Sequence, residues 1–142
     1  MTRLVTFQLA DSTYALDTTQ VVEILRPQTI TPVPRAPALV AGLLNLRGRI
    51  IAAIDLRTRL GLPRGDAAMN ILVTARAGPV SLLVDRIGDV IEVDAARFSA
   101  IPDTTPSVLR GVVIGSYSFP DRLVLVLDAD RIVVSDEERA AS

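Results

Sequence analysis

Short apolar stretches, each ended by turn-forming residues, follow one another along most of the chain. Residues 4–9 alternate apolar and polar positions, as a strand with one buried face does, and a turn over residues 10–12 follows. Residues 18–20 fit either a connection between strands or one helical turn. Further strands are predicted over residues 14–17, 21–25, 43–46, 50–54, 70–75, 80–85, 90–93, 109–115 and 123–128. The pattern is typical of an all-β protein with many short strands.

The most specific stretch is a predicted hairpin over residues 43–54. Two apolar runs flank Arg47, Gly48 and Arg49, which indicates two strands joined by a tight turn. Gly48 adopts a positive φ at low cost, so Arg47 is expected to project from the tip. Asp55 is expected to cap a short helical turn that ends before Gly61.

The two halves of the chain form a repeat of about 70 residues. The matched pairs, with their offsets, are Asp17 and Asp85 (68), Gly42 and Gly111 (69), and Asp55 and Asp128 (73). We therefore expect two copies of a five-stranded unit, each a small barrel, because closure removes exposed edge strands. Residues 63–66 form a short linker, so the expected subdomains are 10–64 and 65–135, packed around a groove, with the N-terminal strand able to cross between them. Asp55 and Asp128 are interpreted as caps or turn-formers, and the hairpin tips as the places where the copies differ.

Composition excludes several classes of function. The 142 residues include no Cys and no His, and all 15 basic residues are Arg. Thiolate and imidazole metal sites, a histidine general base and a lysine-dependent phosphate loop are therefore absent from the chain. A net charge of −1 argues against nucleic-acid binding. Without a signal-peptide pattern or a long apolar run, we expect a cytoplasmic protein that does not insert into the membrane. The missing Cys, His and Lys fit a protein with no cofactor and no metal that is not an enzyme.

Taken together, these motifs resemble the CheW-like family, the adaptor domain of bacterial chemotaxis arrays. The resemblance covers nearly the whole chain. It is carried by residues 7–9 with Tyr14, 22–25, 32–37, 42–48, 54–61 and 83–90. Its most specific part is Asn-Leu-Arg-Gly over residues 45–48, followed by Asp-Leu-Arg over residues 55–57.

The resemblance implies a single CheW-like domain over residues 1–142, made of two packed SH3-like five-stranded barrels with short helical turns. It also implies a non-catalytic signal-transduction scaffold. Such adaptors couple the cytoplasmic tips of methyl-accepting chemotaxis receptors to the regulatory domain of the histidine kinase CheA. The protein would then be recruited to membrane-associated receptor arrays.

Site residues also follow from the resemblance, position by position. The receptor-binding set is Arg47, Asn45, Leu46, Gly42 and Val33, and the kinase-binding set is Val21, Glu23, Val84, Ile87 and Val90. The chain departs from the family where ring-forming members often carry an Arg and an aromatic residue, since it has Ser99 and Thr104. The resemblance therefore does not extend to the ring contact.

Simpler interpretations stand beside these. Arg47 also fits a solvated hairpin residue, and Val33, Val21 and Ile87 fit the core as well as an interface. Residues 136–139 fit a solvated helix end. A divergent CheW-like scaffold in another motility or developmental pathway is the alternative function. An enzyme or small-ligand sensor on twin barrels is disfavoured, because no pair of carboxylates is recognisable from spacing.

Overall fold

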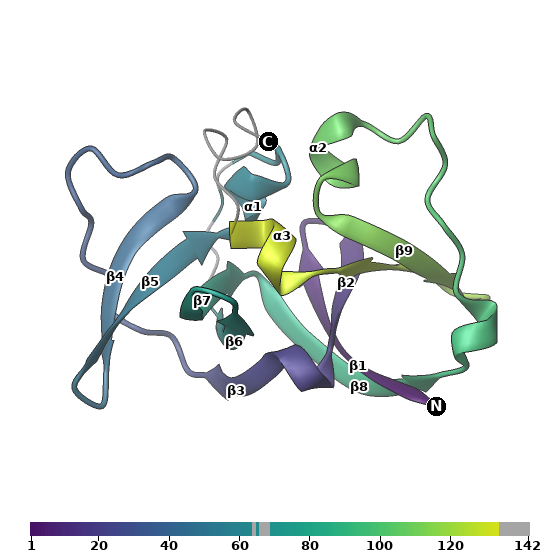
Figure 1. The fold of residues 1–142 in the computed structure, drawn as a ribbon, viewed down its shortest axis with the longest axis horizontal. Coiled ribbons are helices and arrows are strands. Elements are labelled where there is room, and N and C mark those ends of the chain that lie inside the picture. Colours follow the sequence, from purple (N-terminus) through teal and green to yellow (C-terminus); the bar gives the residue numbers. More distant parts are fainter. Residues whose placement is uncertain (64, 66–68, 134–142) are drawn as a thin grey trace.

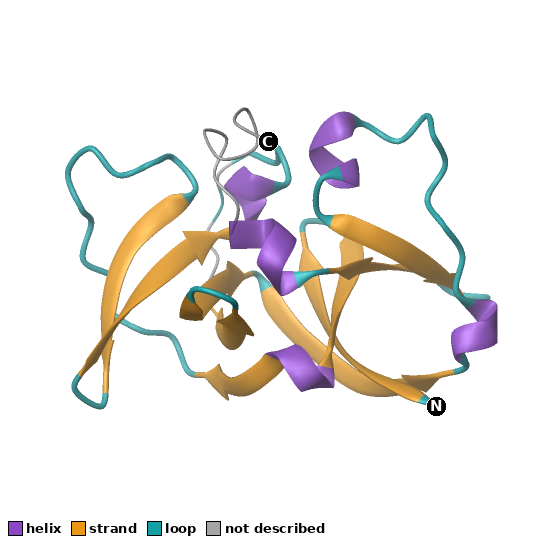
Figure 2. Cartoon of the chain, in the orientation of Figure 1, coloured by secondary structure: helices purple, strands orange, loops and turns teal. Residues whose placement is uncertain are grey.

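The structure is a computed structural model that describes residues 1–63, 65 and 69–133. The predicted helix end at residues 136–139 and the boundary at 135 lie outside this part. The described strands are β1 (Thr2–Leu9), β2 (Ser12–Asp17), β3 (Val21–Leu25), β4 (Val40–Leu46), β5 (Arg49–Asp55), β6 (Met69–Ala75), β7 (Gly78–Val84), β8 (Arg86–Val93), β9 (Val113–Ser118) and β10 (Leu123–Leu127) (Figure 1). Short helices are η1 (Thr18–Gln20), α1 (Leu56–Arg59), η2 (Ala95–Arg97), α2 (Ser107–Arg110) and α3 (Ala129–Val133) (Figure 2). The predicted all-β class is confirmed.

Local sequence signals predicted most of the elements, with one exception. Asp17 caps η1, which resolves the ambiguous residues 18–20, and Asp55 caps α1 as predicted. The strand expected over residues 109–115 was wrong at its start. The carbonyl of Pro106 accepts from the backbone N–H groups of Leu109 and Arg110, so this segment is helical and β9 begins at Val113. None of the described helices is long and apolar enough to span a membrane.

The ten strands form two five-stranded sheets with the same topology. One has the order β8-β1-β2-β10-β9 and the other β3-β6-β7-β5-β4. Each contains an exchanged hairpin, β1–β2 or β6–β7, which pairs antiparallel with one strand and parallel with another, as β2 does with β10 and β7 with β5. The two copies of the repeat have therefore exchanged their first hairpins.

This exchange corrects the expected division of the chain at residue 64/65. Strands β6 and β7 follow that point in sequence but lie in the sheet of β3, β4 and β5, and β2 lies in the sheet of β8, β9 and β10. Sheet membership changes instead between β2 and β3 and again between β7 and β8. Strands β1 and β2 both lie in the sheet of β8, β9 and β10.

Both sheets curve into barrels, and each is closed by one bridge beyond its named strands. Thr31, in the proline-rich segment after β3, exchanges two backbone hydrogen bonds of 2.8 Å with Leu43 on β4. Ser99 and Ser116 do the same on the other sheet, with bonds of 2.9 and 2.8 Å. These bridges pair backbone groups at the sheet edges, as the expectation of closed barrels requires.

The main core lies between the sheets rather than inside either barrel. Each exchanged hairpin contributes four buried side chains to it: Phe7, Leu9, Tyr14 and Leu16 from β1–β2, and Ile71, Val73, Leu82 and Val84 from β6–β7. The opposite faces of the same strands fill smaller barrel interiors, with Leu4 in one and Leu72 in the other. The exchanged hairpins are thus buried on both faces, and polar residues of β1 and β2 such as Thr6 and Thr13 are buried with the apolar ones.

A partly buried ion pair links the two sheets at the edge of this core. Arg57 on α1 donates from Nε to Asp85 Oδ1 at 2.8 Å and from Nη2 to Asp85 Oδ2. The same carboxylate accepts the backbone N–H of Ala10, in the β1–β2 turn, at 2.8 Å. Both charged side chains are less than one-fifth exposed. The hydrogen bonds from Arg57 lower the pKa of Asp85, against the effect of burial, and the Ala10 N–H lowers it further.

Asp85→Asn should therefore destabilise the fold at neutral pH. We expect the free energy of unfolding to fall by about 2 kcal/mol at pH 7, the typical worth of a charge-assisted hydrogen bond. The native pKa lies below the ordinary value, so the stabilisation is complete above about pH 5 and is lost as the pH falls through the native pKa. Urea denaturation of both proteins from pH 7 to pH 2 measures the difference.

Asp121→Asn, in the exposed β9–β10 turn, is the matched control and should change little at any pH. Two results would contradict this account of Asp85. One is an equal free energy of unfolding for the wild type and Asp85→Asn at pH 7, and the other is a difference between them that is as large at pH 2 as at pH 7.

Candidate functional site

The β4–β5 turn holds Arg47 in a defined direction. Leu46 pairs with Arg49, so Arg47 and Gly48 form a two-residue loop. Their φ angles are 51° and 87°, the signature of a type I′ hairpin turn. The sequence predicted the positive φ at Gly48 but not the one at Arg47, which a residue with a side chain seldom adopts. The side-chain oxygen of Asn45 accepts the Gly48 N–H at 3.0 Å and closes the turn.

Arg47 forms a two-pronged ion pair with Glu23 on β3. Nη1 donates to Oε1 at 2.8 Å, and Nη2 donates to Oε2 at 2.9 Å. The hydrogen bonds from Arg47 lower the pKa of Glu23, and the carboxylate raises the pKa of Arg47. The Arg47 side chain is 67% exposed and that of Glu23 34%. An ion pair this exposed contributes little stability, so its main effect is to orient the guanidinium.

This ion pair also connects the two edges of its sheet. Strands β3 and β4 are the two edges of their sheet, and the pair joins β3 to the tip of the β4–β5 hairpin. Beneath it lies a shallow pocket of about 340 Å³ whose lining includes Leu46, Ile51 and Leu72. Val22, at its margin, is 55% exposed and Ile50, on β5 next to the turn, is 66% exposed. The tip therefore combines an oriented cation with exposed apolar surface, a combination suited to binding a protein.

The other expected receptor-binding residues lie around the same hairpin. Leu46 lines the pocket, and Asn45 shapes the turn. Gly42 is buried on β4, where a Cβ would lie 2.3 Å from the carbonyl oxygen of Thr31. Val33, 38% exposed, lies in the proline-rich segment that the Thr31–Leu43 bridge joins to β4. The expected receptor-binding residues therefore all lie on the β4–β5 hairpin or on the segment bridged to it.

The expected kinase-binding residues do not form one surface. Glu23 belongs with Arg47, while Val21 and Ile87 are half-buried against the main core. Val84 is 0% exposed and cannot contact a partner directly in this conformation. Val90 is 58% exposed on β8, an edge strand of the other sheet.

The second copy of the repeat has no equivalent of this site. Its β9–β10 tip pairs Phe119 with Arg122, so Pro120 and Asp121 occupy the places of Arg47 and Gly48. Glu92, the counterpart of Glu23, pairs with Arg3 at 3.1 Å instead. In the closing bridges, Gly115 rather than Gly111 corresponds to Gly42, because each glycine precedes the bridged residue.

Sequence reasoning missed the exposed apolar residues beside Arg47. Along β3 the polar Glu23 lies between Val22 and Ile24, which are 55% and 43% exposed. A register shift between Val21 and Glu23 interrupts the regular alternation of β3, so Val22 and Glu23 both line the pocket beneath Arg47. A charged residue within an apolar strand was thus the available signal. In the described part of the chain, no three acidic side chains are grouped so that they could hold a metal ion.

Comparison with known proteins gives a consistent picture. Residues 3–137 match the family model described as CheW-like domain. The chain is 28% identical to a chemotaxis protein CheW of Rhizobium meliloti, over 97% of this chain and 91% of the relative. It is 32% identical to one from Treponema pallidum, over 95% of this chain and 84% of the relative. The scaffolding protein TtCheW from Thermoanaerobacter tengcongensis superposes with a TM-score of 0.86 at 27% identity, covering 95% of this chain and 94% of that one.

Gly42→Ala should displace the segment that closes the barrel next to the site. A Cβ there would meet the Thr31 carbonyl oxygen at 2.3 Å and Ile30 at 2.8 Å, so backbone must move. We expect a loss of about 1–3 kcal/mol in the free energy of unfolding, the usual cost of overpacking. Hydrogen exchange at the amides of Thr31 and Leu43, which form the bridge, should become faster.

Gly48→Ala in the same hairpin is the control, because no atom lies within 4 Å of its added Cβ. It should strain the turn and leave the Thr31–Leu43 amides protected. Equal exchange rates at those amides in the wild type and Gly42→Ala would show that Gly42 does not hold the bridge.

Proposed function

Since this chain belongs to the CheW-like domain family, we propose that it couples chemotaxis receptors to the histidine kinase CheA by binding alone. Its curated relatives are chemotaxis proteins and its structural neighbour is a scaffolding protein, which favours this role over a scaffold for another pathway. The partners are the cytoplasmic tips of methyl-accepting receptors and the regulatory domain of CheA. The adaptor performs no catalysis, and it joins membrane-associated arrays through these contacts.

One observation carries the receptor side of the proposal: the ion pair that orients Arg47 at the hairpin tip. Glu23 accepts one hydrogen bond each from Nη1 and Nη2, yet 67% of the Arg47 side chain remains exposed. Guanidinium donors suit carboxylates and carbonyl oxygens on the surface of a helical receptor tip. Val22 and Ile50 supply apolar contacts on either side. The receptor-binding surface is thus Arg47 with Asn45, Leu46 and Val33, and Gly42 sets its position.

Glu23 fits this surface better than a kinase contact, because its carboxylate is bound to Arg47. The kinase surface we propose is centred on Val90 and the exposed edge of β8. Ile87 and Val21 support it from the core side, where both pack against the main core. Val84 acts only through that core.

A charge swap tests whether Arg47 contacts the receptor itself. Arg47→Glu places two carboxylates together and should weaken co-sedimentation with receptor tips by about tenfold, as loss of a central Arg does at many interfaces. The double variant Glu23→Arg with Arg47→Glu restores an ion pair with the charges exchanged. It should fold normally and still fail to bind receptor, because the guanidinium then lies on β3.

The control is Arg110→Glu on α2, an exposed residue outside the pocket, where the same charge reversal should leave receptor binding unchanged. Full receptor binding by the double variant would show that the ion pair only positions the hairpin. Full receptor binding by Arg47→Glu alone would remove Arg47 from the site.

A second substitution tests the kinase surface separately. Val90→Asp puts a charge on the β8 edge and should weaken binding of the CheA regulatory domain by about tenfold while leaving receptor binding unchanged, because a charge in an apolar contact must be desolvated. Leu123→Asp is the matched control, since Leu123 is 52% exposed on the same sheet against 58% for Val90. Calorimetric titration of each variant with the kinase domain measures the effect. Equal losses in both variants would indicate a general effect of added charge and contradict a contact at Val90.

A further inference from the structure

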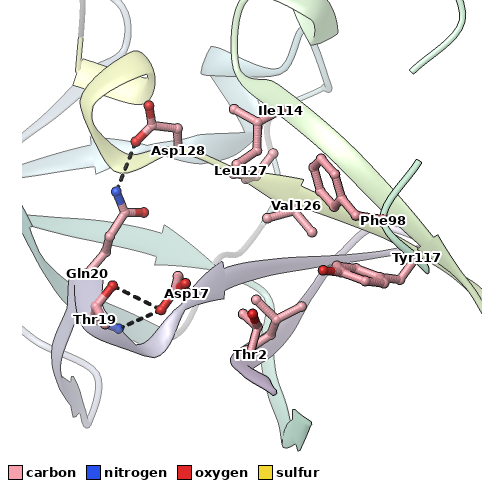
Figure 3. A pocket seen from close by; sticks show the side chains of 11 residues that line it. Thr2, Asp17, Thr19, Gln20, Phe98, Ile114, Tyr117, Val126, Leu127 and Asp128 are labelled. Carbon is pink, nitrogen blue, oxygen red and sulfur yellow. Dashed lines mark hydrogen bonds between the residues drawn. The ribbon is translucent and has the colours of Figure 1, made fainter. Parts of the chain in front are cut away.

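The barrel formed by β1, β2, β8, β9 and β10 contains an open cavity of about 310 Å³. Figure 3 shows its two contrasting sides. Phe98 and Tyr117 form one, with ring centroids 5.4 Å apart and planes tilted by 59°. Asp17 and Asp128 lie on the other, where η1 and α3 begin, and none of the described residues that line the cavity is basic. Nothing in the receptor and kinase proposal uses this cavity.

Tyr117 places a polar group in this cavity without a partner. Tyr117 is only 5% exposed, and its ring points its hydroxyl toward the polar side in Figure 3. Within residues 1–63, 65 and 69–133, no hydrogen bond to this hydroxyl is formed. Burial raises the pKa of Tyr117, and the carboxylates of Asp94 and Asp17 raise it further. The neutral phenol can therefore accept a hydrogen bond from a ligand, and a buried polar group left without a partner is costly.

Asp17 supplies an available negative charge on the opposite side. Its Oδ1 accepts both the backbone N–H and the hydroxyl of Thr19, each at 2.9 Å. Its Oδ2 has no hydrogen-bond or ion-pair partner in the described part of the chain. Asp128 is less available, because Oδ1 accepts from Gln20 at 2.9 Å and Oδ2 lies 3.8 Å from Arg131. A cation between Asp17 and Tyr117 would satisfy both free oxygens.

Apolar groups determine the rest of the ligand. Phe98 lies against the backbone at Gly115, where a Cβ would come within 1.9 Å of its ring. Phe98 is 39% exposed and Ile114 is 40% exposed, although both line the cavity. Such side chains favour an aliphatic stem inside and a protein surface outside, which a free small cation would not provide.

We propose that this cavity binds an arginine side chain presented by a partner protein. The planar guanidinium has five donors, so it can donate to Asp17 Oδ2 and to the Tyr117 hydroxyl together while stacking against an aromatic ring. A lysine has donors but no planar face. This proposal goes beyond the adaptor function and holds whichever partners bind at Arg47 and β8.

The first experiment titrates the full chain with N-acetyl-arginine amide and follows backbone amide resonances by NMR. We expect saturable shifts at Thr19, Gln20, Phe98 and Tyr117. N-acetyl-citrulline amide, a neutral molecule of the same shape, should cause none. Equal shifts from both compounds, or shifts from arginine confined to other residues, would overturn the proposal.

Two variants test the named atoms. Asp17→Asn keeps an N-cap for η1 but removes the charge, and Tyr117→Phe keeps the ring but removes the hydroxyl. Each should weaken the apparent affinity for the arginine amide by about three- to tenfold. Asp121→Asn, an exposed carboxylate outside the cavity, should leave it unchanged. Affinity unaltered in both cavity variants, or lowered equally by Asp121→Asn, would overturn the site.

A third comparison identifies the source of the guanidinium. A five-residue peptide with one central Arg between Gly and Ser should bind at least as tightly as agmatine, a free guanidinium compound, because its backbone can cover Phe98 and Ile114. Binding of agmatine with exclusion of the peptide would overturn the assignment to a partner protein and make the cavity a site for a small cation.

Discussion

The whole fold depends on burying two exchanged hairpins on both faces. β1–β2 and β6–β7 each place four side chains in the core between the sheets, while their opposite faces fill the barrel interiors. Neither copy of the repeat can complete a sheet alone, because each supplies the central strands of the other. The two barrels therefore cannot separate without exposing the largest apolar cluster in the described chain. Arg57 and Asp85 reinforce this arrangement by tying α1 to the β1–β2 turn.

Because of this constraint, the residues that build the core and cap the helices are similar in the two copies, whereas the residues at the hairpin tips differ. The aspartates at the strand ends recur because both copies need the same helix caps, as Asp55 and Asp128 illustrate. The hairpin tips are free of the core and can differ. Arg47 stands where the other copy has Pro120, and among the described residues the first tip alone forms an ion pair with the opposite edge strand of its sheet. Asymmetry between two otherwise equivalent barrels thus marks the site more reliably than charge alone.

Local sequence patterns predicted the strands, the Arg47–Gly48 turn and the caps, because alternation and turn chemistry act over a few residues. They could not predict the hairpin exchange, since a strand that pairs within its own copy or with the other has the same alternation. The Arg47–Glu23 contact joins residues 24 positions apart, which lies beyond the reach of any local pattern. The sequence comparison matched Gly42 to Gly111, because the offset between the two copies changes along the repeat. In the structure Gly115 is the counterpart of Gly42, since each of these two glycines precedes the residue that forms the closing bridge. The sequence also could not predict which face of a strand is buried. Val84 and Val90 are both valines within apolar stretches, yet Val84 is 0% exposed and Val90 is 58% exposed.

The same architecture limits how an adaptor of this kind can pass a signal. Coupling between two sites through a protein requires an element with two discrete arrangements, and the densely packed core between the barrels supplies a rigid frame instead. The Arg47–Glu23 pair differs from the frame because it is exposed and weakly stabilising, so a partner's carboxylate can replace Glu23 at little cost. Under the proposed function, the receptor would replace Glu23 at Arg47 while the packed core holds the hairpin tip in a set position relative to the β8 edge. A change in receptor geometry would then reach the kinase as a change in position, without a conformational switch within the barrels.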